Sequence, residues 1–298
     1  MGSKIDKFQK MRRSLDGTSV GDAFGMRILL RPELLVSRTL PAATWRWSDD
    51  THMTLSVVEN LAMHGRIDQD SLIAAFARRY AEDPHRAYGL GVRKLLEQVG
   101  SRPWQELTTA VFANGSWGNG AAMRATPIGA YFSDDLSCAA AEAILSATVT
   151  HAHPEGQAGA AAVAVAAALA AQPAPPVGRE FLEAVCPYVP AGAVLDGIEK
   201  ALHIAPEEHA QAVAVLGTGR QISAQDTVPY CLWCAAHHLD NFEEALWTTI
   251  AGLEDGDTTC AIVGGIVALA APIPAEWLAA REALVGLEEW VAGRLITG

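Results

Sequence analysis

Leu253-Glu254-Asp255-Gly256-Asp257-Thr258-Thr259 stands directly before the apolar run 260–269. The pattern predicts a loop that leads into a buried helix, and Asp257 and Thr258 are residue types that cap helix N-termini. The helix dipole favours ionised carboxylates there. Because such carboxylates repel one another, the stretch requires a cation or a basic side chain nearby. Its ligand atoms are all oxygen, which suits Mg²⁺, Mn²⁺ or Ca²⁺ better than zinc.

A second stretch of this kind, Ser48-Asp49-Asp50-Thr51, opens the helical pattern 52–61 near the other end of the chain. Two acidic helix starts with adjacent hydroxyl groups could share a pair of metal ions. Since the two stretches must meet to form one site, we expect residues 1–298 to fold as a single compact domain.

The composition indicates an all-α protein. Half of the 298 residues are hydrophobic and alanine is abundant, which suits a large helical core. Patterns with a period near 3.6 predict helices at 8–26, 50–64, 68–82, 89–98, 103–112, 121–132, 229–238 and 242–252, and one or two closing helices within 277–296.

Charge and cysteine content exclude several classes of protein. A formal net charge of −12 argues against a nucleic-acid-coating surface, so nucleic acid is expected at most as a modified substrate. Five cysteines, an odd number, fit a reducing cytoplasm, where we expect the protein. Cys231 and Cys234 lie in one helical pattern without a second pair, which predicts core cysteines, not zinc ligands. The most apolar segment, 158–171, is shorter than the ~20 residues of a membrane span.

Gly17, Gly21 and Gly25 recur at four-residue spacing in the first helix. This spacing clears one stripe of side chains, so another backbone can approach closely. Asp22 lies on the same helix, and we interpret it as a buried carboxylate bonded to a neighbouring backbone.

Two further motifs carry polar residues, Gly118-Asn119-Gly120-Ala121-Ala122-Met123-Arg124 and Thr150-His151-Ala152-His153-Pro154. Free N–H groups in the glycine-rich turn could hold a phosphate or a ribose, although a plain helix connection fits equally well. The oxygen-rich Asp motifs suit a harder ion than imidazole prefers, so His151 is predicted to be a polar wall residue. His153 is predicted to bond to the turn before a helix that starts at Pro154.

These motifs, taken together in chain order with Gly17-x-x-x-Gly21-Asp22-Ala23-x-Gly25, resemble those of the ADP-ribosylglycohydrolase family, which includes the dinitrogenase-reductase-activating glycohydrolases. The resemblance spans nearly the whole chain. It implies many orthogonally packed helices around a central cleft that holds two Mg²⁺ ions, with Mn²⁺ possible. It also implies that Asp22 supports the metal-binding loop from behind, and that the partner is an ADP-ribosylated protein or small molecule.

The resemblance also implies a set of site residues. The implied metal ligands are Ser48, Asp49, Asp50, Asp255, Asp257 and Thr258, and either Asp49 or Asp50 serves as the catalytic base. The implied substrate-binding residues are Ser116, Trp117, Gly118, Asn119, Gly120 and His151.

The expected reaction is hydrolysis of the N-glycosidic bond between ADP-ribose and arginine. Relatives that act on serine linkages carry a Glu soon after the Gly-Asp motif, whereas here the nearest acid is Glu33. Arginine-type relatives have an Asp where this chain has Ser116. Another linkage (nucleobase, serine or small molecule), a non-catalytic crystallin-like member of the family and a two-metal phosphoesterase are the alternatives.

Overall fold

The computed structural model describes residues 2–284, and side chains from Asp6 onward. Within these residues the chain forms only helices, turns and isolated β-bridges, which confirms the all-α prediction. The elements are α1 (Gly2–Leu30), α2 (Glu33–Ser37), α3 (Asp49–His64), α4 (Gln69–Glu82), α5 (Leu90–Leu96), α6 (Trp104–Val111), η1 (Asn119–Ala121), α7 (Thr126–Tyr131), α8 (Leu136–Thr148), α9 (Pro154–Ala170), α10 (Gly178–Val185), η2 (Cys186–Tyr188), α11 (Ala193–Ala201), α12 (His209–Leu216), α13 (Ala224–His237), α14 (Phe242–Ile250), α15 (Gly256–Val267) and α16 (Ala275–Ala280).

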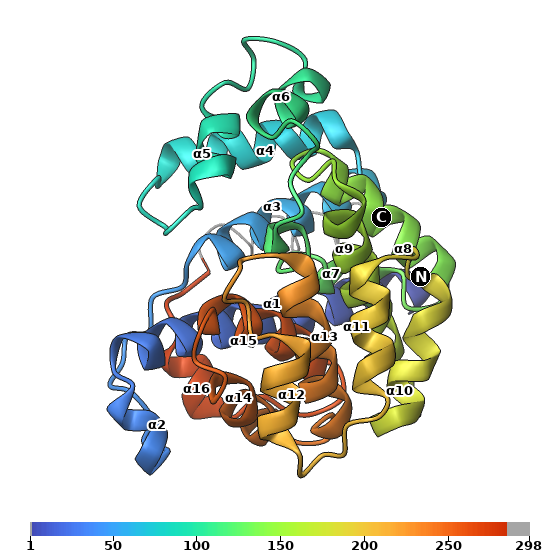
Figure 1. Cartoon of the computed structure of the whole chain (residues 1–298). Coiled ribbons are helices and arrows are strands. Elements are labelled where there is room, and N and C mark those ends of the chain that lie inside the picture. The colour runs from blue at the N-terminus through green and yellow to red at the C-terminus, as the bar shows by residue number, and fades with distance from the viewer. Residues whose placement is uncertain (1, 285–298) are drawn as a thin grey trace.

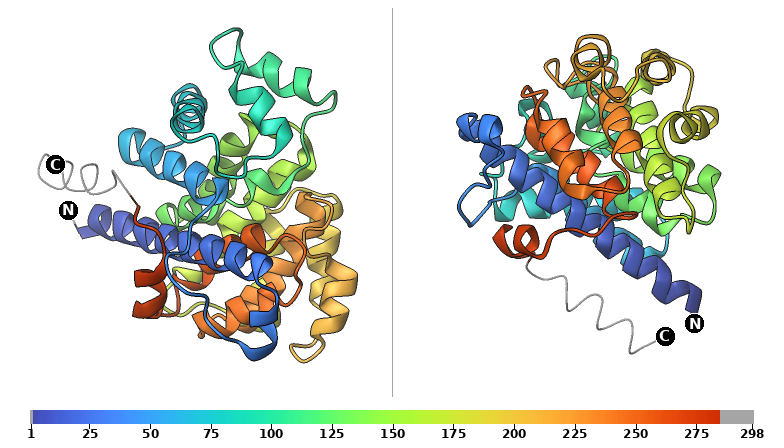
Figure 2. Two further views of the ribbon diagram at one scale, coloured as in Figure 1. Left: turned by 90° about the vertical axis from the view of Figure 1, so that its left-hand side faces the viewer. Right: turned by 90° about the horizontal axis from the view of Figure 1, so that it is seen from below.

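Helices α1 and α15 pack along each other through the middle of the body (Figures 1 and 2). The predicted glycine stripe makes this approach possible. A Cβ atom on Gly17, Gly21 or Gly25 would overlap backbone atoms of α15 at Gly264, Cys260 or Gly256 respectively. The stripe therefore fixes the start of α15 against the C-terminal half of α1.

The remaining helices surround this pair. Helices α3, α7, α13 and α14 contact one or both of its members, and α9, whose alanine-rich sequence is almost wholly buried, lies between α8 and α13. Helices α4, α5 and α6 form a cap beyond α3 (Figure 1).

Within residues 2–284, no helix combines the length and the apolar character that crossing a membrane demands.

Most predicted helices occur within two residues of their expected bounds, but three predictions differ from the structure. The first helix runs from Gly2 to Leu30 and so extends beyond the predicted range 8–26 at both ends. The predicted helix 121–132 is divided into η1, a turn and α7, because Pro127 has no N–H group to continue a helix and instead occupies the first turn of a new one. Helix α13 begins at Ala224, before the expected Pro229.

Near the C-terminus, α16 covers the start of the closing segment. The second helix predicted there, together with the end of the segment, lies outside the described residues. The cysteine prediction is confirmed in so far as Cys231 and Cys234 are fully buried, unpaired thiols on one helix.

Candidate active site

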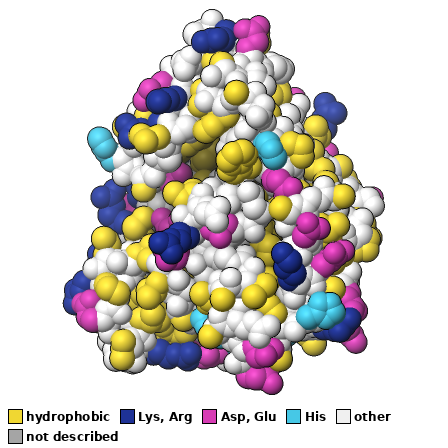
Figure 3. All heavy atoms as spheres, viewed as in Figure 1, with side chains coloured by type: hydrophobic (Ala, Val, Ile, Leu, Met, Phe, Trp, Pro, Cys, Tyr) yellow, Lys and Arg dark blue, Asp and Glu magenta, His cyan; other side chains and the backbone are white. Residues whose placement is uncertain are grey.

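A cavity of about 710 Å³ opens between the cap and the body, where Figure 3 shows a hollow in the surface. This volume is typical of small-molecule sites. Most of the predicted site residues line it, and they come from segments far apart in the sequence: Asp49, Asp50, Ser116, Trp117, Gly118, Asn119, Gly120, His151, Asp255, Asp257 and Thr258.

Ser48 is the exception, because it lies behind the cavity wall. Its hydroxyl caps α3 by accepting from the N–H of Asp50 (3.3 Å) and donates to the Asp50 carboxylate (2.8 Å). Ser48 thus supports Asp50 in this structure, and its role as a metal ligand stays a prediction.

Asp22 joins α1 to the start of α3. Its carboxylate accepts from the N–H groups of Ser48 (2.9 Å) and Thr51 (3.1 Å) and from the Thr51 hydroxyl (2.6 Å). These bonds use donors that the first turn of a helix leaves free. Asp22 therefore holds the acidic turn in place from behind, in agreement with the sequence-based interpretation.

At the start of α15 the acidic side chains are arranged differently from expectation. The N-cap is Asp255, not Asp257 or Thr258, and its side chain makes no capping bond. Instead, the Asp255 carboxylate accepts from the side-chain amide of Asn119 (2.7 Å), which also bonds to Thr227 (3.0 Å). Asn119 thus links the glycine-rich turn to the acidic stretch.

The carboxylates raise one another's pKa values. Burial raises the pKa of Asp22 and of Asp255 to about 7, and the nearby charge of Asp257 adds to both shifts. Burial and the neighbouring carboxylates hold the pKa values of Asp49 and Asp50 well above the usual range. A group of ionised carboxylates is unstable here without a compensating positive charge.

Two observations indicate that a metal ion fits among these carboxylates. Asp50 Oδ1 is buried and has no hydrogen-bond partner, so a carboxylate oxygen is free for a cation. Among the residues that the structure describes, no Lys or Arg lines the cavity, so no basic side chain there supplies the charge. The oxygen-only donor set suits Mg²⁺.

The carboxylates do not form a complete metal cage by themselves. In the described part of the chain, no group of three His, Cys, Asp or Glu side chains is arranged to hold an ion alone. Mg²⁺ ordinarily keeps several waters and takes one or two carboxylates. The residues therefore fit an ion whose remaining ligands are hydroxyl, water or substrate oxygens.

The glycine-rich turn forms another part of the cavity wall, beside Asp255. The Ser116 hydroxyl accepts from the N–H of Gly118 (3.1 Å), and Trp117 is 51% exposed at the rim. His151 is buried beside this turn, and its Nδ1 bonds to the Thr150 hydroxyl (2.7 Å). His153 caps α9 by accepting from Glu155 N–H, as expected.

Several residues of the cavity wall were not predicted from the sequence. Phe112, Leu90 and Ile222 add apolar surface, and Met53 lies on α3 below Asp49 and Asp50. For Ile222 the Gly217-Thr218-Gly219 turn was an available signal, since such turns mark loops that can reach a site. Leu90 and Phe112 carried no signal beyond ordinary helix patterns.

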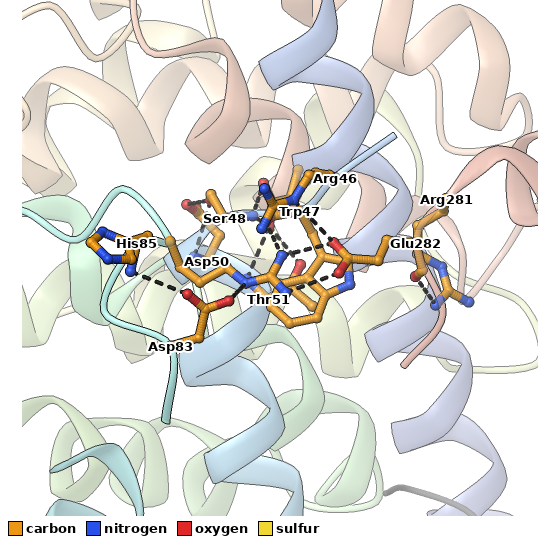
Figure 4. A network of polar contacts seen from close by, with 11 residues as sticks. Arg46, Trp47, Ser48, Asp50, Thr51, Asp83, His85, Arg281 and Glu282 are labelled. Atoms are coloured by element: carbon orange, nitrogen blue, oxygen red, sulfur yellow. Dashed lines mark hydrogen bonds and ion pairs between the residues drawn. The ribbon is translucent and has the colours of Figure 1, made fainter. Parts of the chain in front are cut away.

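A polar network lies behind the start of α3 (Figure 4). Arg86 donates to the Trp47 carbonyl oxygen (3.1 Å) and its guanidinium lies 3.6 Å from the centre of a Trp47 ring. It also pairs with Glu282 (2.7 Å) and Asp83 (2.8 Å). Because Trp47 precedes the acidic turn directly, this network ties the turn to two distant segments.

Comparison with known proteins gives one family. The model of the family described as ADP-ribosylglycohydrolase matches residues 3–297. A solved structure titled "ADP-ribosylglycohydrolase-related protein complex" superposes with a TM-score of 0.66 at 24% identity, covering 93% of each chain. This likeness shows that the fold is shared.

Curated relatives include proteins named ADP-ribosylhydrolase ARH3. The mouse protein is 28% identical over 284 residues, which is 83% of this chain and 75% of that one. The chicken protein is 34% identical over 117 residues, a match that covers 38% of this chain and only 32% of the chicken protein. An uncharacterized protein of Archaeoglobus fulgidus is 30% identical over 94% of each chain.

Proposed function

The chain belongs to the ADP-ribosylglycohydrolase family, and from that premise we propose that it is a Mg²⁺-dependent hydrolase that removes ADP-ribose from arginine side chains. The observation that carries the proposal is the meeting of two acidic helix starts and a glycine-rich turn around one cavity. That cavity has room for a small molecule and is lined by the carboxylates and by the glycine-rich turn.

Mg²⁺ would be held by Asp49 and Asp50 from α3 and by Asp255, Asp257 and Thr258 from α15. Ser48 would contribute through Asp50, to which its hydroxyl donates. When bound, such ions supply positive charge that orients the ribose hydroxyls and favours ionisation of water. The free oxygen of Asp50 and the raised pKa values of the carboxylates support this assignment.

The chain's own residues would act on the bond as follows. Asp49 or Asp50 accepts a proton from the attacking water while the C–N bond at the anomeric carbon breaks and a C–O bond forms. The acceptor leaves as neutral guanidine, because the departing nitrogen carried the positive charge of the guanidinium. Asn119 and the Gly118–Gly120 turn hold the ADP-ribosyl group against the carboxylates.

Arginine is favoured over serine by the position of Glu33. A serine oxygen is a poor leaving group that needs a general acid. Glu33 lies on α2, pairs with Arg31 and does not line the cavity, and among the described residues no other Glu lines it.

A second candidate is hydrolysis of another ADP-ribose linkage. The similarity to proteins named ADP-ribosylhydrolase ARH3 favours it. A non-catalytic role is disfavoured by the retention of all four Asp side chains in the cavity.

The test is a panel of ADP-ribosylated arginine, serine and nucleobase substrates, each assayed with Mg²⁺ and with EDTA. We expect release of free ADP-ribose from arginine with Mg²⁺ only, and little or none from serine. Release of AMP in place of ADP-ribose would identify a phosphoesterase. Efficient cleavage of the serine linkage would overturn the arginine assignment.

A further inference from the structure

Arg124 is fully buried, yet within the described part of the chain no carboxylate bonds to it. Its guanidinium donates to the carbonyl oxygens of Gly120 (2.8 Å) and Ser146 (2.9 Å) and to the hydroxyl oxygen of Thr150 (2.8 Å), while Phe76 stacks on it. Burying a charge without a counter-charge is costly. In spite of this cost, the hydrogen bonds hold the guanidinium between the glycine-rich turn and Thr150.

The hydrogen of the Thr150 hydroxyl has one good acceptor. The oxygen accepts from Arg124, so the hydroxyl hydrogen points elsewhere. The Ala147 carbonyl lies 3.5 Å away and already accepts from the N–H groups of Thr150 (3.0 Å) and His151 (2.7 Å). His151 Nδ1 lies only 2.7 Å from the hydroxyl. The hydroxyl therefore donates to Nδ1, which leaves the hydrogen of a neutral imidazole on Nε2.

The Nε2 atom of His151 faces the glycine-rich turn. It lies 3.2 Å from the positions that Cβ atoms on Gly118 and Gly120 would occupy, so a side chain at either position would crowd the ring. Within the described residues Nε2 has no hydrogen-bond partner, and the side chain lines the cavity. Burial and the nearby Arg124 charge lower the pKa of His151 to about 3, which keeps the ring neutral.

We propose that Arg124 and Thr150 are positioning residues that hold His151 as a neutral Nε2–H donor to an acceptor oxygen of the ADP-ribosyl group. The proposal rests on the function proposed above and names a device within that site. A neutral donor suits a cavity whose charged lining is all carboxylate, because a histidine cation would pair with the carboxylates that the metal ions require.

The first test needs no substrate. Long-range ¹H–¹⁵N spectra of the imidazole groups at pH 7 identify the tautomer, and the signal of His151 is assigned by its loss in His151→Gln. We expect the Nε2-protonated form in the wild type and in Thr150→Ser, which keeps the hydroxyl. Thr150→Val keeps the side-chain shape but removes the donor, so we expect Nδ1 protonation to appear. A wild-type ring protonated on Nδ1 would overturn the proposal.

The second test uses ADP-ribose as the probe, titrated with Mg²⁺ present by calorimetry. We expect Thr150→Val to weaken the Kd on the order of tenfold, as for the loss of one well-placed hydrogen bond, and Thr150→Ser to restore it. In turnover assays the KM should rise while kcat changes little. An unchanged Kd in Thr150→Val, with the tautomer altered, would show that His151 does not donate to this ligand.

The variant Arg124→Lys tests whether the guanidinium group or only its positive charge is required. Lysine keeps a cation but lacks the two terminal nitrogens of the guanidinium, one of which donates to Gly120 while the other donates to Ser146 and Thr150, so we expect a mixed tautomer in a folded protein. A lowered Tm with the wild-type tautomer retained would assign Arg124 a structural role only. If the wild type fails to bind ADP-ribose at all, the proposed function fails together with the ligand named here, while the tautomer still decides whether Arg124 and Thr150 position His151.

Discussion

At the scale of single residues, Asp257 is the carboxylate on which the charge of the site depends most. Its charge contributes to the raised pKa of Asp22, Asp49, Asp50 and Asp255 alike. The same side chain lines the cavity at the start of α15. Without a cation the raised pKa values let protons relieve the repulsion, so removal of this carboxylate chiefly removes a proposed ligand from the metal-bound protein.

Asp257→Ala should therefore separate stability from activity. We expect hydrolysis to fall by at least about 100-fold, the upper range for lost support of a metal site. In EDTA the Tm should change little, whereas the rise in Tm that Mg²⁺ gives the wild type should disappear. Turnover and thermal melting with and without EDTA measure both effects. Normal turnover in this variant would remove Asp257 from the site.

His151 gives a prediction for acid stability. The pKa is lowered from its usual value to about 3, so the folded state keeps the ring neutral while the unfolded chain takes up a proton below about pH 6.5. The stabilising contribution is present above that pH and is lost as the pH falls toward 3. Relative to neutral pH, the unfolding free energy lost through His151 at pH 5 amounts to about 2 kcal/mol.

His151→Gln should consequently show a flatter decline in unfolding free energy between pH 7 and pH 5 than the wild type. Urea unfolding in EDTA at both pH values measures the difference. Parallel declines in the two proteins would show that His151 is not held neutral by the fold.

At the scale of helices, the close pairing of α1 and α15 sets the position of the acidic turn. The Gly21 Cα hydrogen faces the Cys260 carbonyl oxygen, where a methyl group has no space. Since the obstacle is backbone, it cannot move aside as a flexible side chain can. The helix pair must separate to admit even one carbon atom.

Gly21→Ala is predicted to lower the unfolding free energy by about 3 kcal/mol, although alanine is the better helix former. Gly89→Ala is the control, because a Cβ atom there meets nothing within 4 Å. Denaturant unfolding of both variants measures the difference. Equal stabilities would mean that α1 and α15 are less closely packed than described.

Helical periodicity and the glycine spacing were sufficient to predict the elements that carry the site. The break at 122–125 was missed because the apolar pattern continues through it, while Pro127 and the bonds of Arg124 decide the backbone. The N-cap of α15 was predicted as Asp257 or Thr258, whereas a distant contact favours Asp255. Its partner, Asn119, lies more than 100 residues away, and sequence patterns report neighbours along a helix only.

At the scale of the whole molecule, distant segments hold the acidic turn of α3 in place. Arg86, from the connection between α4 and α5, bonds to Glu282 near the end of the described chain and to the Trp47 carbonyl oxygen. Arg86 is largely buried, so its pairing with Glu282 is less weakened by water than an ion pair on the surface. Neither residue is marked by its sequence surroundings, which is why the network was not predicted.

Glu282→Gln should lower the unfolding free energy by about 1–2 kcal/mol and weaken Mg²⁺ binding. Glu244→Gln is the matched control, since Glu244 also makes two bonds to an arginine, Arg38, but in an exposed pair. Its loss should cost less than about 1 kcal/mol and leave Mg²⁺ binding unchanged. Chemical unfolding and metal titration measure the effects. If the two variants show equal effects, the network around Arg86 does not support the site.

The pairing of the first helix with the last long one also has a consequence for biosynthesis. Asp49 and Asp50 leave the ribosome roughly 200 residues before α15 does, and at ~5–20 residues per second this takes roughly 10–40 s. Throughout that time the glycine stripe of α1 has no helix against it, and half of the carboxylates are absent. A nascent chain therefore has an incomplete site until α15 has left the ribosome.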